Sequence, residues 1–146
     1  KNIVHNLNSL DLVENINTDI LYLDPPYNER QYLPNYHILE TIAKYDNPTI
    51  KGVTGIRDYE NKKSTFCNPK TALRDLELII QKSNFKHLIL SYNSEGIMSQ
   101  EDIIALMSNY GKVAFEQFLY ARFKSNNKGL SKTKKTVYEQ VYILTK

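Results

Sequence analysis

The feature that most constrains the fold of this chain is an apolar run that stops at a carboxylate and two prolines, Leu21-Tyr22-Leu23-Asp24-Pro25-Pro26-Tyr27. The run from Ile20 to Leu23 predicts a short buried strand. Pro25 and Pro26 end that strand, because neither residue can donate a ladder hydrogen bond. Asp24 is therefore expected at the carboxyl end of a strand, where open α/β sheets bind their ligands.

These residues suit one kind of chemistry, the activation of an exocyclic amine on a planar base. Such a nitrogen needs acceptors for both of its hydrogens before its lone pair can attack an electrophile. Asp24 offers a carboxylate, and Pro25 offers a carbonyl on a backbone whose φ is fixed by the ring. Tyr27 offers an aromatic face on which an extruded base can stack.

The Asp24-Pro25-Pro26-Tyr27 stretch resembles the Asp-Pro-Pro-Tyr motif of S-adenosylmethionine-dependent amino methyltransferases, above all the D12-class (Dam-like) DNA adenine-N6 enzymes. The resemblance implies catalytic roles for Asp24, Pro25, Pro26 and Tyr27, with S-adenosylmethionine as the cofactor. The competing interpretation is a strand end and a Pro-Pro turn, with Asp24 as a cap and Tyr27 in the core.

The segment before this motif has a layout that also occurs in the D12 class. Residues 2–5 predict a short strand, and Asn8 or Ser9 is expected to begin a short helix over residues 10–16. In the family, the turn after that strand carries a polar residue, often Asp, that contacts the adenosyl group. The resemblance thus implies cofactor binding by Asn8, Ser9 and Asp24, and a helix-capping role for Asn8 is the alternative.

The residues after the motif are expected to border the target base. We predict a loop over residues 28–35, in which Arg30 meets a phosphate and Tyr32 meets the base or the gap that it leaves. A helix is predicted over residues 36–45, with Asn35 as its cap. Residues 47–69 predict a long loop, of the kind that is usually functional or mobile.

The rest of the chain predicts an α/β fold. Helical periodicity covers residues 70–83, a buried strand is expected over residues 86–90, and Ser99 begins a further helix. Two strands, over residues 112–123 and 136–144, follow without an intervening helix, so the last should run antiparallel. This plan is similar to a partial Rossmann-like methyltransferase fold, with a mostly parallel sheet and an antiparallel final strand, in which Glu139 is a structural residue.

The connector between the last two strands, residues 122–135, is the basic segment of the chain. It carries six positive charges and no acid, although the whole chain has a net charge of only +3. A local basic patch favours a polyanion partner. Together with the family resemblance, it predicts binding of double-stranded DNA with a flipped adenine, through Arg122, Lys124, Lys128, Lys132, Lys134 and Lys135.

Length and composition set the remaining bounds. The 146 residues suit a single domain with a core of its own. No apolar run approaches the length of a membrane span. The single Cys67 excludes an internal disulfide framework and a cysteine metal cluster, which favours a cytoplasmic setting. The family resemblance implies that this cytoplasm is bacterial. We expect no metal, since His37 and Glu40 have no further ligand at a suitable spacing.

The resemblance covers only the back half of the family pattern. The Phe-x-Gly-x-Gly turn that holds the methionine end of the cofactor is absent, and the chain begins at Lys1 rather than Met. We therefore expect residues 1–146 to be one partial catalytic domain of a restriction–modification methyltransferase, inactive by itself. The alternatives are an RNA guanine-N2 methyltransferase and a non-catalytic nucleic-acid-binding remnant.

Overall fold

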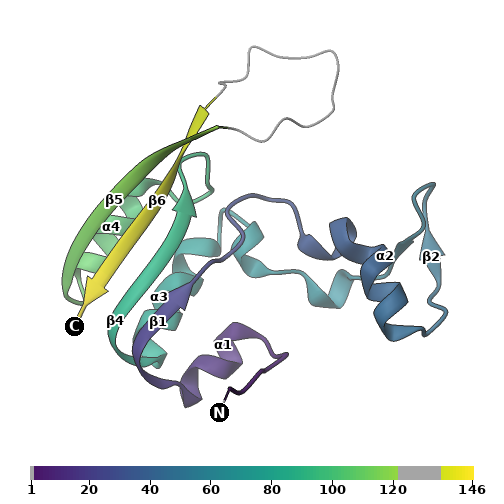
Figure 1. The fold of residues 1–146 in the computed structure, drawn as a ribbon, viewed down its shortest axis with the longest axis horizontal. Helices are drawn as coiled ribbons and strands as arrows, with labels where there is room; N and C mark the ends of the chain where they lie inside the picture. The colour runs from purple at the N-terminus through teal and green to yellow at the C-terminus, as the bar shows by residue number, and fades with distance from the viewer. Residues whose placement is uncertain (1, 122–135) are drawn as a thin grey trace.

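The computed structural model describes residues 2–121 and 136–146, and in this part of the chain a four-stranded sheet carries the fold (Figure 1). The order of the strands is β1-β4-β6-β5, where β1 is Asn17–Leu23, β4 is Asn84–Asn93, β5 is Lys112–Ala121 and β6 is Thr136–Thr145. β1 and β4 are parallel, and β6 runs antiparallel to both β4 and β5. The prediction of a mostly parallel sheet with a reversed final strand is confirmed.

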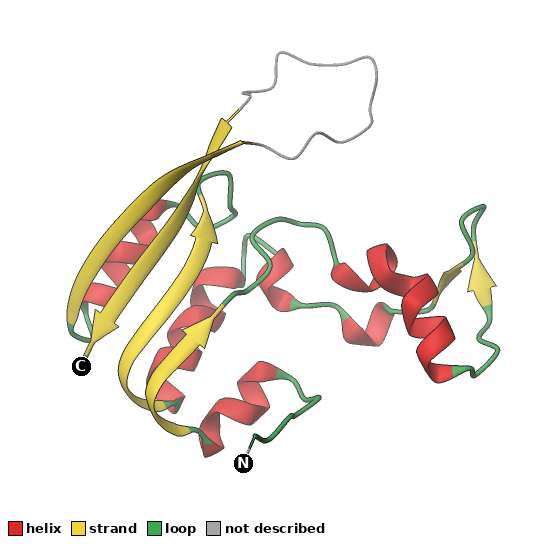
Figure 2. Ribbon diagram, in the orientation of Figure 1, coloured by secondary structure: helices red, strands yellow, loops and turns green. Residues whose placement is uncertain are grey.

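The helices that pack on the sheet are α3, Ala72–Lys82, and α4, Gln100–Ser108. They lie on one face of the sheet, behind the strands as drawn in Figure 2. Ser99 caps α4, because its hydroxyl oxygen accepts a hydrogen bond from the Asp102 N–H at 3.1 Å. The core lies between this helical layer and the sheet, and its fully buried members include Leu76, Ile79, Ile80, Leu88, Leu90, Ile103, Met107, Tyr142 and Leu144.

The opposite face of β1 is open, which corrects the prediction of a buried strand. Leu21 and Leu23 pack against the core, whereas Ile20 and Tyr22 are 56% and 59% exposed. Successive side chains on a strand point to opposite faces, and α3 covers only one of them. The predicted strand at residues 2–5 also does not form, and Ile3 and Val4 are exposed.

The first helical segment is short, as the sequence predicts. It consists of α1, Ser9–Leu12, and the 3-10 helix η1, Val13–Asn15. Asn8 is the N-cap, since its side-chain oxygen accepts a hydrogen bond from the Leu10 N–H at 3.0 Å. The capping interpretation of Asn8 is therefore confirmed.

The segment between β1 and α3 forms an arm that projects from the sheet, at the right of Figure 1. The arm contains α2, Tyr32–Lys44, and a small hairpin of β2, Ile50–Lys51, and β3, Ile56–Arg57. Two 3-10 helices, η2 at Glu60–Lys62 and η3 at Thr65–Cys67, lead back to α3. Residues 47–69 thus contain short regular elements, where the sequence predicts a long loop. In the described residues, no helix is long and apolar enough to cross a membrane.

Candidate active site at the carboxyl ends of the parallel strands

Asp24 lies where the sequence predicts, directly after the end of β1. Leu23, the last residue of β1, pairs in parallel with Leu90 of β4, so Asp24 emerges at the same edge of the sheet as Ser91 and Tyr92. Asp24 is exposed, and Tyr27 is 39% exposed. A carboxylate and an aromatic ring are therefore both open to a ligand at the edge where α/β sheets bind ligands.

The backbone of Tyr27 is held by the turn that follows β4. The Tyr27 carbonyl accepts a hydrogen bond from the Ile97 N–H at 2.8 Å and a longer one from the Tyr92 hydroxyl at 3.4 Å. The same hydroxyl accepts from the Met98 N–H at 3.2 Å. Tyr92 is only 3% exposed, and burial raises the pKa of its phenol, which therefore stays a neutral donor.

A second polar pair lies further along the same edge. The buried Asn93 donates a hydrogen bond through Nδ2 to Oε1 of Glu139, at 2.9 Å, and accepts one from the Glu95 N–H at 2.9 Å. Glu139 belongs to β6 and faces Asn93 across the ladder. This pairing fits the structural role predicted for Glu139 and joins the ends of β4 and β6.

Beyond Tyr27 the chain turns into α2 sooner than predicted. The Asn28 side-chain oxygen accepts a hydrogen bond from the Arg30 N–H at 2.9 Å, which forms a local turn, and Arg30 itself is exposed. Tyr32 is the first residue of α2, so the loop predicted over residues 28–35 ends at Gln31. The helix begins early because Pro34 fits its first turn, where no N–H bond is required.

Tyr32 lies close to the motif in space. Its ring stacks on Tyr36, with 6.0 Å between the ring centroids. The pKa of Tyr32 is raised, first by burial and then by the negative charge of Asp24. Tyr32 is thus close enough to sense the charge of Asp24, and its contact with the target base stays a prediction.

Asn8 and Ser9 line a different feature, an open pocket of about 650 Å3. The pocket lies between the amino-terminal segment, α2 and the 61–66 segment, and its walls are mostly polar. Lys62 lies beside Lys44 in this wall, and the neighbouring ammonium lowers the pKa of Lys62. Its lining residues are Asn6, Leu7, Asn8, Ser9, Leu10, Leu33, Glu40, Lys44, Asn61, Lys62, Lys63, Ser64, Thr65 and Phe66.

Two further predictions concern phosphate binding and metal binding. The six predicted phosphate-binding cations, Arg122, Lys124, Lys128, Lys132, Lys134 and Lys135, lie outside the described residues. Across residues 2–121 and 136–146, no group of three or more His, Cys, Asp or Glu side chains is arranged to hold a metal ion. Cys67 is a buried free thiol, and burial raises its pKa.

Sequence reasoning missed the residues that hold the motif in place. Tyr92 and Ile97 donate hydrogen bonds to the Tyr27 carbonyl although they lie about seventy residues further along the sequence. Gln31 forms two hydrogen bonds with Ser64 at the base of the arm. The sequence held only an indirect indication of these contacts, namely a polar loop that follows a strand predicted to lie beside the strand of Asp24. It indicated that the loop faces the site, but not which of its atoms reach Tyr27.

Comparison with known proteins connects this geometry to a family. The D12 class N6 adenine-specific DNA methyltransferase family matches residues 1–106. The chain is 42% identical over 130 residues to the type II methyltransferase M.FokI of Planomicrobium okeanokoites and 40% identical over 147 residues to the modification methylase StsI of Streptococcus sanguinis. It is 39% identical over 144 residues to the type II methyltransferase M.NlaIII of Neisseria lactamica.

These alignments use most of this chain but a minor part of each relative. They cover 87%, 99% and 98% of the chain, and 20%, 22% and 42% of the three relatives in the same order. The chain therefore spans between a fifth and about two fifths of the length of these relatives. No solved structure matches the chain significantly.

Proposed function

The chain belongs to the D12 class N6 adenine-specific DNA methyltransferases, and we propose from this that it supplies the target side of the active site of such an enzyme. The reaction is transfer of a methyl group from S-adenosylmethionine to the N6 atom of adenine in DNA. The observation that carries the proposal is the exposure of Asp24 and Tyr27 at the carboxyl ends of two parallel strands, with the Tyr27 backbone held from behind.

In this proposal Asp24 and the Pro25 carbonyl orient the target amine. Each accepts one hydrogen of the amine, which draws the nitrogen toward tetrahedral geometry and frees its lone pair. The fixed φ of Pro25 and Pro26 keeps the two acceptors in place. Rate enhancement then comes from positioning and from electrostatics, and no covalent enzyme intermediate is required.

Tyr27 is proposed to stack on the flipped adenine. Its partial exposure leaves an aromatic face open, while its carbonyl is fixed by the Ile97 N–H. Because the backbone of Tyr27 is already anchored, stacking of its ring on the base would cost little further conformational entropy of the loop. Tyr32, whose pKa is raised in part by the charge of Asp24, is proposed to meet the base or the gap that it leaves.

The polar pocket lined by Asn8 and Ser9 fits the adenosyl side of the cofactor. Its volume of about 650 Å3 lies within the range of small-molecule sites, roughly 300–1,000 Å3. The Asn8 oxygen is used by the helix cap, but its amide nitrogen and the Ser9 hydroxyl can hydrogen-bond an adenine edge or a ribose. When bound, the cofactor supplies an electrophilic methyl group on a sulfonium.

The proposed partner is double-stranded DNA. Arg30, exposed just after the motif, and the basic segment at residues 122–135 are the proposed phosphate contacts. The names of the relatives, type II methyltransferases and modification methylases, support a place in a restriction–modification system, in the cytoplasm of a bacterium.

The test is a methyl-transfer assay of the full-length protein with labelled S-adenosylmethionine and mixed-sequence duplex DNA. Mass spectrometry of the digested product should identify N6-methyladenine. Asp24→Ala should lower turnover on the order of 10²–10³-fold, which is the usual loss when one positioned polar group is removed. Its affinity for S-adenosylhomocysteine should remain within about threefold of the unsubstituted protein.

Asp19→Ala is the matched control, because Asp19 is an exposed carboxylate on β1, the strand that precedes Asp24, and pairs with Lys86 at 2.7 Å. Its turnover should be unchanged. Near-normal turnover of Asp24→Ala would refute the role of Asp24. Methylation of ribosomal RNA at guanine N2, with none of DNA, would favour the alternative enzyme class. DNA binding without methylation of either substrate would favour the non-catalytic alternative.

A further inference from the structure

The loop from Asp24 to Gln31 is outside the ladder of the sheet, so other contacts must set its position. It joins β1 to α2, and α2 belongs to the projecting arm (Figure 1). In the described residues α2 packs mainly on β3, where Arg57 forms a bidentate ion pair with Asp46, at 2.6 and 3.1 Å. The arm is thus held together internally, and its packing on the sheet is slight.

A two-point contact between Gln31 and Ser64 closes the base of this arm. The Gln31 side-chain amide donates to the Ser64 carbonyl at 3.1 Å and accepts from the Ser64 N–H at 2.7 Å. The Cys67 thiol adds a hydrogen bond to the Arg30 carbonyl at 3.4 Å. Gln31 precedes α2, but its side chain does not cap the helix. Among the described residues, its amide therefore bonds to Ser64 and not to the end of the helix.

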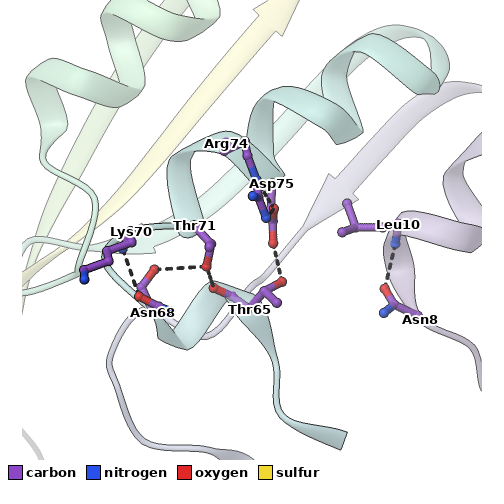
Figure 3. Close-up of polar contacts among 8 residues, drawn as sticks. All are labelled: Asn8, Leu10, Thr65, Asn68, Lys70, Thr71, Arg74 and Asp75. Atoms are coloured by element: carbon purple, nitrogen blue, oxygen red, sulfur yellow. Dashed lines mark hydrogen bonds and ion pairs between the residues drawn. The ribbon is translucent and has the colours of Figure 1, made fainter. Parts of the chain in front are cut away.

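The segment at residues 64–67 is itself fixed to the core. The Thr65 hydroxyl donates to the carboxylate of Asp75, and the Thr71 hydroxyl donates to the Thr65 carbonyl at 2.6 Å (Figure 3). Asp75 is fully buried in α3 and forms an ion pair with Arg74 at 2.9 Å. A buried carboxylate with these partners is costly to displace. The end of the loop is therefore anchored to α3 by a route that does not pass through β1.

The same segment forms a wall of the polar pocket, because Ser64, Thr65 and Phe66 are among its lining residues. Gln31 thus joins the loop that carries Asp24 and Tyr27 to the wall of the pocket that fits the adenosyl group. Methyl transfer requires the donor and the acceptor to be held at a set distance and angle, and an error of 1 Å can cost about 10²-fold in rate.

We propose that Gln31 is a positioning residue that sets the target loop against the cofactor pocket by holding the backbone of Ser64. The inference rests on the proposed function for its kinetic consequence. Gln31 acts through Asp24 and Tyr27 rather than on the substrate. Its loss should therefore reduce alignment of the two substrates more than the binding of either one.

The test substitutes Gln31→Met in the full-length protein, which keeps the length of the side chain and removes both hydrogen bonds. Turnover should fall by at least about tenfold. Dissociation constants for S-adenosylhomocysteine and for mixed-sequence duplex DNA should each stay within about threefold. Gln81→Met is the matched control, since Gln81 lies on α3 and its amide donates to the Tyr110 hydroxyl at 2.8 Å. Its turnover should be unchanged.

Hydrogen exchange on the same proteins tests the contact without any reaction. The Ser64 amide and the peptide covering residues 24–31 should exchange faster in Gln31→Met and at the normal rate in Gln81→Met. Normal exchange, unchanged turnover, or a parallel loss of both affinities would each overturn the inference. If the unsubstituted protein transferred no methyl group, the proposed function would fail, and exchange would still decide whether Gln31 holds the loop.

Discussion

Substitution of Gly96 by alanine probes the hydrogen bonds that the turn after β4 donates to the Tyr27 carbonyl. Gly96 lies in the turn after β4, and a Cβ built there would be 2.8 Å from Cζ of Tyr92 and closer still to Cε1 of that ring. It would also be 2.9 Å from the Asn93 carbonyl oxygen, which already accepts a hydrogen bond from the Gly96 N–H at 2.8 Å. The turn has little freedom to move, so the ring of Tyr92 must be displaced.

The cost follows from how tightly that ring is packed. Carbon atoms rest about 3.5–4.0 Å apart, so relief of the clash needs a shift on the order of 1 Å. Tyr92 is 3% exposed, and its hydroxyl contacts the Met98 N–H and the Tyr27 carbonyl. Overpacking a core costs about 1–3 kcal/mol. The lower entropy of alanine in the unfolded chain offsets only about 0.4–1 kcal/mol. With this offset, we expect Gly96→Ala to lower the free energy of unfolding by about 0.5–2.5 kcal/mol.

Urea unfolding, followed by circular dichroism, measures this loss, and a double-mutant cycle with Tyr92→Leu assigns it to the ring. In the Tyr92→Leu background the obstacle is gone, so the further cost of Gly96→Ala should drop by at least about 1 kcal/mol. Turnover of the full-length Gly96→Ala protein should fall as well, because Tyr27 loses its support. An equal cost of Gly96→Ala in both backgrounds, or no cost at all, would refute the reasoning.

Three further predictions address the site and the core. Tyr27→Phe should retain most activity in the methyl-transfer assay and Tyr27→Ala should lose it, because stacking contributes about 1–3 kcal/mol per base; equal losses would indicate chemistry of the hydroxyl. Replacing Lys132, Lys134 and Lys135 with Gln should flatten the salt dependence of DNA binding by about 0.9 in log–log slope for each phosphate that is no longer neutralised, and an unchanged slope would exclude a phosphate-binding role for these lysines. Burial raises the pKa of Tyr142 to about 12 from an ordinary value of 10.0, so the neutral phenol stabilises the fold fully below pH 10. That stabilisation, up to about 2–3 kcal/mol, should disappear in urea unfolding as the pH rises from 10 to 12, and Tyr142→Phe should remove this pH dependence.

The sequence alone determined the features that depend on neighbouring residues. The end of β1 at Leu23 follows from two consecutive prolines, and the start of α4 follows from the Ser99 cap. The apolar period of α3 and the reversed final strand could also be read directly. The first three features depend on hydrogen bonds and burial within one element, and the last depends on the lack of a helical pattern between two strands. The local sequence therefore contains their causes.

Only the tertiary structure decided which distant groups meet at the site. Tyr92 reaches Tyr27 because β1 and β4 are parallel neighbours, and the turn after β4 then folds back toward the motif. Gln31 pairs with Ser64 because the arm leaves and rejoins the core at the same place. Both bonds use main-chain atoms of one partner, which every residue possesses, so the residue types alone carry no signal for them.

The exposure of β1 was also a tertiary outcome. Its apolar run predicts a buried strand, yet α3 covers only the face that carries Leu21 and Leu23, while Ile20 and Tyr22 stay open. The hydrophobicity of a side chain sets how much free energy its burial would contribute. Whether it is buried depends on how the helices pack on the sheet. The sequence thus indicated Asp24 and Tyr27 as candidate site residues, and the fold supplied the contacts that hold the Tyr27 backbone.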